Sequence, residues 1–179
     1  TGKLFAPHMA IIGFHKAIQT VLGPNEVENH ADHLHFANLR VHDCLVAYES
    51  NCRQSQNVLF GKLQVVGFTN VIFDLKRTGS LHVQHLAADN CRLVMRTGAL
   101  FPNGNHFLID HIKVALAPNW RLLEMTRPAG IFFSCAGHVQ RRSAPAQDAI
   151  VVRGDPANQI IRVDLVQNHR PLAIEIVRE

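Results

Sequence analysis

The chain has 179 residues, of which 47% are hydrophobic and 18% charged, and its 18 Lys and Arg outnumber its 14 Asp and Glu by four. These proportions exclude a disordered tail, a collagen and a coiled coil, and the length allows one or two domains with a sizeable core. The modest positive excess permits an acidic partner without indicating a nucleic-acid-binding domain.

The four cysteines, Cys44, Cys52, Cys91 and Cys135, are scattered and form no Cys-x-x-Cys pair. We therefore expect reduced thiols rather than a zinc ribbon or a small secreted disulfide framework. The sequence has no N-glycosylation sequon, no signal peptide and no apolar run near eighteen residues, so nothing supports secretion or membrane spanning. Because the chain begins with Thr1, we expect a processed or fragmentary piece of a longer protein.

Residues 1–29 are less regular than the remainder. The segment AIQTVL (residues 17–22), followed by Gly23-Pro24, fits a short helix or a strand that ends at a corner. We interpret residues 1–29 as an irregular lead-in or a first partial coil, with Ile12 as the anchor of an early copy of the repeat described next.

From Leu34 onward, a pattern of about two dozen residues repeats. A copy has an apolar anchor, an apolar residue two positions before it, and apolar residues three and five positions after it; the last two copies fit more loosely, with His138 and Asn158 at positions that are apolar elsewhere. The anchors are Phe36, Phe60, Val83, Ile109, Phe133 and Ile160, spaced by 24, 23, 26, 24 and 27 residues. Alternation at a spacing of two predicts strands, and the step of three predicts a bend or bulge.

A second short apolar run follows each copy, at residues 45–48, 71–73, 93–95, 122–125, 150–152 and 172–176. No run is long enough for an amphipathic helix, so the copies must bury their apolar positions by coiling and stacking as strands. The sequence therefore predicts an all-β fold, a right-handed single-stranded parallel β-helix of about six to seven coils that occupies residues 30–179.

Residues at the same offset from the anchor stack above one another, about 4.8 Å apart. Cys44 and Cys91 are then expected two coils apart with Phe68 between them, as buried thiols too distant for a disulfide. Two positions after the anchor lies an outward column of Asn38, Lys62, His85, His111, Cys135 and Arg162, and Arg40 and Lys113 lie beside it.

This basic column predicts a surface that docks an acidic partner, and a solvated sheet face is the alternative. The predicted docking residues are Lys62, His85, His111, Lys113, Arg162, Arg141 and Arg142. The last two belong to the loop QRRSAPAQD (residues 140–148), for which a purely solvated role is the alternative.

Residues for catalysis are not predicted to converge. Carbohydrate-cleaving β-helices need two or three carboxylates from neighbouring coils in one groove, but the aspartates fall at different offsets. Asp89 and His42 share an offset two coils apart and are the one remaining pair. No phosphate-binding glycine loop, nucleophile elbow or metalloprotease motif is present. We therefore predict no enzyme, no catalytic residue and no cofactor.

His30, His33 and His35, in the segment NHADHLH, have the chemistry of metal ligands. On a strand, His33 and His35 share one face, and His30 would have to fold back to join them. A polar lead-in to the first clear coil is preferred over a zinc site, so no metal ligand is assigned.

Two stretches resemble a viral family. Residues 110–120 (DHIKVALAPNW), with Gly130-Ile131-Phe132, resemble the C-terminal half of the large adenovirus early-region transforming protein. Residues 163–165 (VDL), followed by Arg170-Pro171 and Ile174, resemble its final coil. That family carries a Cys- and His-rich segment where this chain reads QRRSAPAQDAIVVRGD. The difference favours its left-hand-end capsid-protein relative in reptilian-type adenoviruses (atadenoviruses).

The resemblance implies a minor capsid protein on the virion exterior, a homotrimeric β-helix that binds the viral major coat protein and stabilises the shell. It implies a location in the virion and, during assembly, in the host nucleus, with no membrane and no direct nucleic-acid binding. The outward apolar residues Leu59, Leu108 and Phe132, all one position before an anchor, are the expected trimer contact, and cover by loops of the same chain is the alternative. Two other functions stay open: a carbohydrate-binding or depolymerising β-helix of tailspike or pectin-lyase type, and a viral host-protein adaptor.

Overall fold

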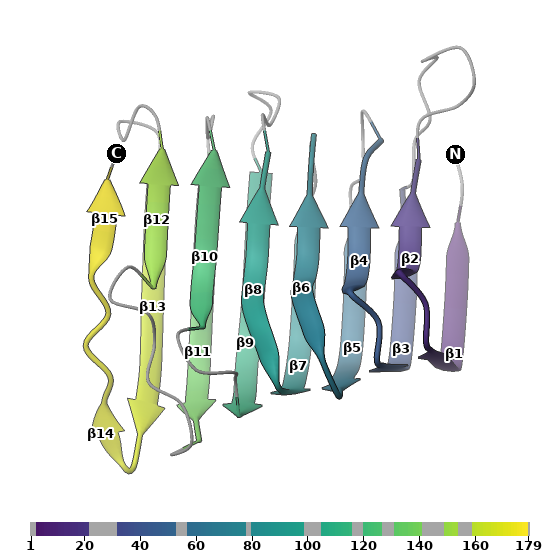
Figure 1. The fold of residues 1–179 in the computed structure, drawn as a ribbon. Helices are drawn as coiled ribbons and strands as arrows, with labels where there is room; N and C mark the ends of the chain where they lie inside the picture. The colour runs from purple at the N-terminus through teal and green to yellow at the C-terminus, as the bar shows by residue number, and fades with distance from the viewer. Residues whose placement is uncertain are drawn as a thin grey trace.

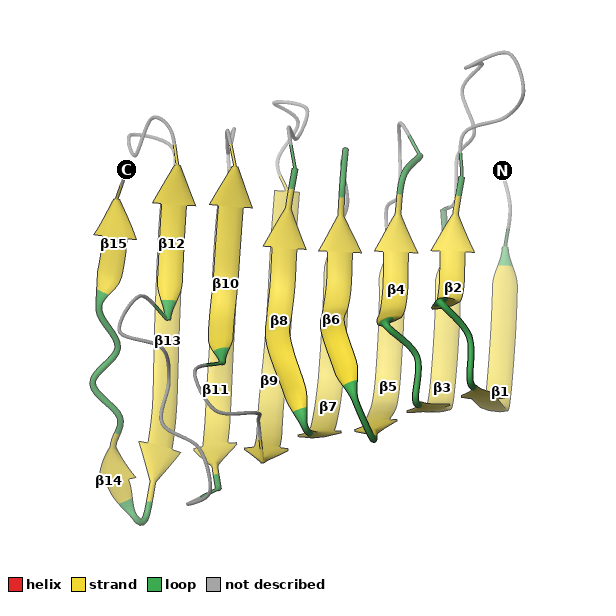
Figure 2. Ribbon diagram, viewed as in Figure 1, coloured by secondary structure: helices red, strands yellow, loops and turns green. Residues whose placement is uncertain are grey.

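The computed structural model describes residues 3–21, 32–52, 57–77, 80–98, 105–115, 120–126, 131–140, 149–153 and 159–178. Strands joined by turns and short loops make up these residues, and no helix is found among them (Figure 2). Accordingly, no helix in the described part of the chain has the length and apolarity that crossing a membrane requires.

The strands alternate between two sheets as the chain advances (Figure 1). Sheet A contains β1 (Leu4–Ile12), β3 (Leu34–His42), β5 (Val58–Val66), β7 (Leu81–Asp89), β9 (Asn105–Ala115), β11 (Ile131–Val139), β13 (Gln159–Gln167) and β14 (Arg170–Pro171). Sheet B contains β2 (Lys16–Thr20), β4 (Val46–Ser50), β6 (Thr69–Leu75), β8 (Cys91–Thr97), β10 (Arg121–Thr126), β12 (Ile150–Arg153) and β15 (Ile176–Arg178).

Neighbouring strands within each sheet pair in parallel, and the two-residue strand β14 pairs antiparallel with β13. Each coil contributes one strand to sheet A and the next to sheet B, and the path is right-handed (Figure 1). The predicted all-β, right-handed parallel β-helix is confirmed.

The corner from sheet A to sheet B is made by residues with positive φ. Gly13, Asp43, Gly67 and Asn90 occupy it in four successive coils, with φ of 76°, 50°, 78° and 62°. Glycine adopts this conformation without a steric penalty, and Asp and Asn are among the residues that adopt it most often. The strands β1, β3, β5 and β7 therefore end immediately before these residues.

Each of β3 to β9 in sheet A bends where two consecutive residues point outward. In β5 these are Gly61 and Lys62, between the buried Phe60 and Leu63. A Cβ at Gly61 would lie 2.7 Å from the carbonyl oxygen of Ala37, so the close approach of the two strands requires glycine. This pair of outward residues is the step of three in the repeat, and the predicted bend is confirmed.

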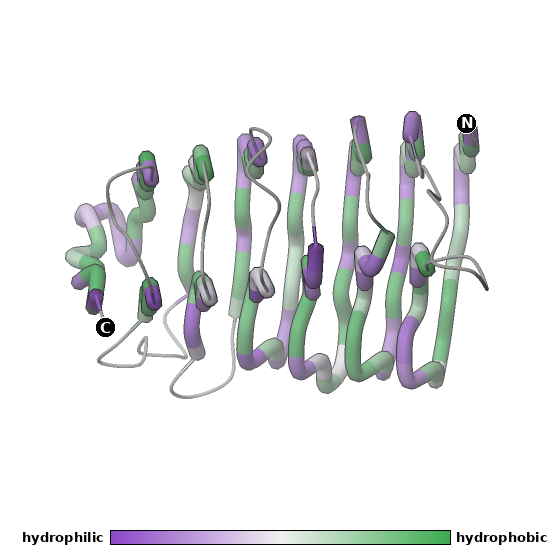
Figure 3. The backbone as a smooth tube through the Cα atoms, turned by 90° about the horizontal axis from the view of Figure 1, so that it is seen from above, coloured by the Kyte–Doolittle hydropathy of each residue, from purple (hydrophilic) through white to green (hydrophobic). Residues whose placement is uncertain are grey.

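The core fills the space between the sheets, and hydrophobic and hydrophilic residues alternate along the coils (Figure 3). Phe36, Phe60, Val83 and Ile109 pair in register as predicted. The Phe36 and Phe60 rings stack with centroids 5.1 Å apart, and Tyr48 from sheet B meets Phe60 edge-on at 5.5 Å. The aromatic stack therefore joins both sheets.

The predicted anchors are wrong in the last two coils. Ile109 pairs with Cys135 rather than Phe133, and Cys135 pairs with Val163 rather than Ile160. Before the bend, β11 follows β9 at a spacing of 26 residues instead of the predicted 24. After the bend the spacing is 25, because β11 has one residue between Cys135 and Gly137 where β9 has two between Ile109 and Ile112. Phe133 is buried nonetheless, whereas Ile160 is 53% exposed.

The first coil also differs from its predicted register. Residues 4–20 form β1 and β2, which pair with β3 and β4, and the partner of Phe36 is Ala6. Ile12, the expected early anchor, lies opposite His42 and is 66% exposed. At the other end, β15 begins at Ile176, so most of the apolar run at residues 172–176 precedes the strand.

All four cysteines are free, as predicted, and all are buried. Burial was predicted for Cys44 and Cys91, whereas Cys135 was expected to point outward. Cys91 pairs in register with Thr69, however, and Phe68 is 43% exposed at the corner rather than between two thiols. Burial raises the pKa of Cys91 and of Cys135 to about 12.

Candidate functional site

The outer face of sheet A divides into two halves at the bend. Most of the basic residues lie at and beyond the bend, and we call the following set of basic and histidine residues the cationic stripe: His8, Arg40, Lys62, His85, His111, Lys113 and His138. His35, His82, His106 and Arg162 lie before the bend. Apolar residues lie before the bend, and we call the following set the apolar patch: Phe5, Leu59, Leu108, Phe132 and Ile160.

The cationic stripe follows the axis of the helix. Lys62 pairs in register with His85, and His85 with His111. Lys113, in the adjacent outward column, pairs with His138. The ring centroids of His85 and His111 are 6.0 Å apart, and those of His111 and His138 are 5.7 Å apart. The structure thus brings together four of the predicted docking residues and adds His138.

The remaining predicted docking residues lie elsewhere. Cys135 was expected in the outward basic column, but the register shift in β11 buries it. Arg162 was expected in the same column, but it pairs with Ser134, and its guanidinium carbon lies 5.7 Å from the ring centroid of Phe132 beside the apolar patch. Arg141 and Arg142 lie outside the described residues.

Leu59 and Leu108 occupy one outward column of sheet A, with His82 between them. Phe132, which was predicted in this column, pairs instead with His106 and lies two positions earlier on its strand. Two of the three predicted trimer contacts are therefore aligned, and the third lies in the neighbouring column.

A hollow of about 370 Å³ opens in the apolar patch. Leu59, Leu108, His33 and His35 are among its lining residues. His35 meets the exposed Phe5 ring edge-on, with centroids 5.0 Å apart. The hollow combines aliphatic walls with imidazole edges, which suits contact with an apolar side chain of another protein surface.

Histidines in the outer face of sheet A use carboxylates as partners where these are close. His82 Nε2 lies 2.6 Å from Asp110 Oδ2, and His42 Nδ1 lies 2.9 Å from Asp43 Oδ2. His42 thus pairs with Asp43 rather than with Asp89, the one pair that the shared offset left open. Among the described residues, no three or more His, Cys, Asp or Glu side chains gather as a metal site requires, and His30 is outside these residues.

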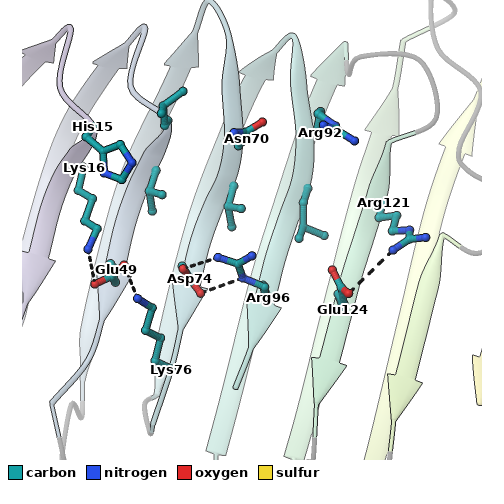
Figure 4. Close-up of a pocket in the computed structure, with 14 residues that line it drawn as sticks. His15, Lys16, Glu49, Asn70, Asp74, Lys76, Arg92, Arg96, Arg121 and Glu124 are labelled. Atoms are coloured by element: carbon teal, nitrogen blue, oxygen red, sulfur yellow. Dashed lines mark hydrogen bonds and ion pairs between the residues drawn. The ribbon is translucent and has the colours of Figure 1, made fainter. Parts of the chain in front are cut away.

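The outer face of sheet B holds a groove of about 860 Å³ that crosses several coils (Figure 4). The sheet B strands bend inward, because consecutive residues such as Ile72 and Phe73 both face the core. Val46, Val71 and Leu93 pair in register and form the apolar floor. One side carries His15, Asn70 and Arg92, and the other carries Glu49, Asp74, Arg96 and Glu124 (Figure 4).

Charged residues of both signs stack along one wall of this groove. Glu49 and Asp74, which are both acidic, pair in register, and Asp74 also pairs with Arg96. Arg96 makes a two-pronged contact with Asp74, in which Nη2 donates at 2.6 Å and Nε at 3.1 Å. The hydrogen bond to Asp74 raises the pKa of Arg96. Such bidentate pairs are among the stronger ion pairs in proteins.

Glu49 is the most enclosed charge of the groove, with 1% of its side chain exposed. Its carboxylate accepts hydrogen bonds from Lys16 Nζ at 2.8 Å and Gln19 Nε2 at 2.7 Å, and Lys76 Nζ lies 3.0 Å away. Burial acts to raise the pKa of Glu49, but these donors together outweigh it and hold the pKa below its ordinary value. Glu49 is therefore ionised at neutral pH and cannot donate the proton that glycoside cleavage requires.

This network was not predicted from the sequence, in which the aspartates fall at different offsets. The missed signal is the spacing within sheet B: Val46 and Glu49, Val71 and Asp74, and Leu93 and Arg96 are each three residues apart. Because the corners vary in length, offsets counted from the sheet A anchors place these residues in different columns.

We compared the chain with protein-family models, with curated proteins and with solved structures, and none of the three comparisons found a match.

Proposed function

We propose that this chain is a non-enzymatic structural protein of a virus, a minor capsid component whose β-helices associate laterally as homotrimers on the virion exterior and stabilise the shell. The observation that carries the proposal is the division of one sheet face into an apolar patch and a cationic stripe. The viral setting rests on the resemblance of residues 110–120 and 163–165 to the adenovirus family.

The apolar patch supports lateral association. Phe5 and Ile160 are 62% and 53% exposed, and Leu59, Leu108 and Phe132 are half-buried. A rigid stack of parallel strands presents these side chains in a nearly flat array, so a second copy can cover several of them at once. Burial of apolar side chains contributes about 25 cal/mol per Å² removed from water.

The cationic stripe supports docking onto an acidic coat-protein surface. Lys62, Lys113 and Arg40 point outward from three strands, and none of them has an ion-pair partner among the described residues. Charge complementarity of this kind sets orientation and speeds association. The stripe and the patch occupy different halves of the face, so self-association leaves the stripe available.

Sedimentation velocity at micromolar concentration tests the self-association. We expect the mass of three chains for the wild type and a smaller species for Leu59→Lys and Leu108→Lys. Phe68→Lys, which alters a half-exposed apolar residue at a corner away from the patch, is the matched control and should stay trimeric. A monomeric wild type, or dissociation by the control alone, refutes the proposal. Detection of the chain in purified virions tests its viral role separately.

The sheet B groove favours one second candidate, a carbohydrate-binding β-helix. An apolar floor between rows of charged and amide groups suits a sugar chain, whose faces are apolar and whose edges carry hydroxyls. Binding of a polysaccharide panel, with loss of binding in Asp74→Asn and Arg92→Gln, would support it. Release of new reducing or unsaturated ends would extend it to depolymerisation.

A further inference from the structure

Histidines are concentrated on one face of this molecule. The chain has 12 histidines, and eight of them lie on the outer face of sheet A: His8, His35, His42, His82, His85, His106, His111 and His138. Histidine is the side chain whose charge ordinarily changes between pH 5 and 8. The charge of this face therefore depends strongly on pH.

The size of that dependence follows from the charged residues that point outward in the seven parallel strands of sheet A. Four are cations (Arg40, Lys62, Lys113 and Arg162) and three are carboxylates (Asp89, Asp110 and Asp164). The formal charge is +1 with neutral histidines and reaches +9 when all eight are protonated. The face changes from nearly neutral to strongly positive.

The change is sharpest within the cationic stripe, where His85, His111 and His138 have adjacent rings. The charged register neighbours of these rings are basic: Lys62 on β5 pairs with His85, and Lys113 on β9 pairs with His138. Arg40 on β3 and His8 on β1 continue the stripe along the axis, two or more strands away from the three rings. The carboxylates near them are Asp89 on β7, Asp110 on β9, which is engaged by His82, and Asp164 on β13.

An anionic partner laid over the stripe places negative charge beside these three rings, and a nearby opposite charge favours the protonated form of an imidazole. Protons are then taken up when the partner binds, and by linkage the affinity for the partner rises as the pH falls.

The chemistry of this face favours carboxylate as the anion. The His82–Asp110 and His42–Asp43 contacts show imidazoles of sheet A paired with carboxylates at 2.6 and 2.9 Å. The stripe offers no aromatic platform of Phe, Tyr or Trp on which the bases of a single-stranded nucleic acid could stack. Its straight course along the axis suits an acidic protein surface that contacts several coils in succession.

We propose that the cationic stripe is a proton-coupled docking site for a carboxylate-rich protein surface, in which His85, His111 and His138 take up protons on binding. The inference rests on the docking role proposed above and adds the chemistry of the partner and its control by pH. Docking is tight in mildly acidic solution and weak at neutral pH.

A fluorescein-labelled polyglutamate peptide tests the proposal by fluorescence anisotropy at constant ionic strength. Its side chains stay mostly ionised down to about pH 5.5. We expect the dissociation constant to fall at least about tenfold between about pH 7.5 and 5.5, since each proton taken up contributes up to about tenfold per pH unit.

Variants separate the two kinds of charge. The triple variant His85→Gln, His111→Gln, His138→Gln should lose the pH dependence and keep the affinity measured at pH 7.5. Lys62→Gln with Lys113→Gln should bind more weakly at every pH. A matched control, His15→Gln with Arg92→Gln, removes a histidine and a cation from the sheet B side and should behave as wild type. Circular dichroism confirms that each variant is folded.

An affinity that does not change with pH, or a pH dependence that survives in the triple variant, overturns the proposal. Heparin and duplex DNA are tested as competitors. If either displaces the peptide and binds far more tightly than it does, without pH dependence, the stripe belongs to another class of polyanion and the proposal is overturned. The oligomeric state of every variant is measured in parallel. A trimer that fails to bind the peptide refutes this inference alone, whereas a monomer that binds it refutes only the proposed self-association.

Discussion

Replacement of Glu49 by Gln tests the charge network of sheet B directly. The substitution preserves the shape of a side chain that is 1% exposed and removes the negative charge between Lys16 and Lys76. The Gln19 amide can still donate to the new side chain, so the loss is confined to the charge. Lys16 and Lys76 both lose this counter-ion.

The expected cost follows from the exposure of the partners. Buried hydrogen bonds to a charged group contribute about 1.5–3 kcal/mol, and solvent-exposed ion pairs about 0–1 kcal/mol. Lys16 and Lys76 are 26% and 42% exposed, so their contribution is screened by water. We expect Glu49→Gln to lower the free energy of unfolding by about 2 kcal/mol, which corresponds to a fall in Tm of about 4–8 °C. Denaturant titration measures the difference at equilibrium.

The pH dependence gives a second test of the same reasoning. The pKa of Glu49 in the folded protein lies below its ordinary value of 4.5, so its stabilisation is complete above that value and is lost as the pH falls through the lower folded pKa. The difference between wild type and Glu49→Gln should be constant from about pH 8 to 5 and should shrink below about pH 4. Glu124→Gln is the matched control, because its carboxylate is more exposed and lies 3.0 Å from Arg153. An equal or larger loss in the control, or a difference that persists at pH 3, would refute the reasoning.

Two further predictions concern the backbone and the thiols. Gly137→Ala should destabilise the fold by more than about 3 kcal/mol, because Gly137 has φ of 142° and an added Cβ would lie 2.6 Å from the Ile112 nitrogen. Gly13→Ala is the control: its Cβ would point into open space at φ of 76°, so it should cost about 1 kcal/mol. Equal losses of the two variants in denaturant titration would contradict the assigned register. Burial raises the pKa values of Cys91 and Cys135 to about 12, so both thiols should resist alkylation by iodoacetamide at pH 8 until denaturant is added. Modification of these thiols in the folded protein, detected by mass spectrometry, would contradict their burial.

The fold could be predicted from the sequence because stacked strands place the same kind of residue at the same offset in every coil. Phe36, Phe60, Val83 and Ile109 show this pattern, and their pairing is as expected. The prediction was wrong from β11 onward. Phe133 is apolar and therefore fits the repeat, but it lies two positions before Cys135, the residue that pairs with Ile109. Gly137, with φ of 142°, follows the single bend residue of β11.

The candidate surfaces were predictable to different extents. Lys62, His85 and His111 lie before the register shift, so their shared column followed from the repeat. Arg162 lies after the shift and was placed in the wrong column. The ion-pair network of Glu49 was not predicted, because offsets were counted from the sheet A anchors. The corners between the sheets differ in length, so this count hides a column of residues that is regular within sheet B.

The two sheets use the same stacking rule to opposite electrostatic effect. In sheet B, the register sets Asp74 beside Arg96, so the charges neutralise each other within the chain. In sheet A, the register sets Lys62 beside His85 and His85 beside His111, so like charges accumulate as the histidines are protonated. Directly opposed like charges on neighbouring strands are destabilising, by amounts of up to about 1 kcal/mol per pair. The groove can therefore strengthen the isolated helix, whereas the cationic stripe gains stability only when carboxylates from another molecule cover it.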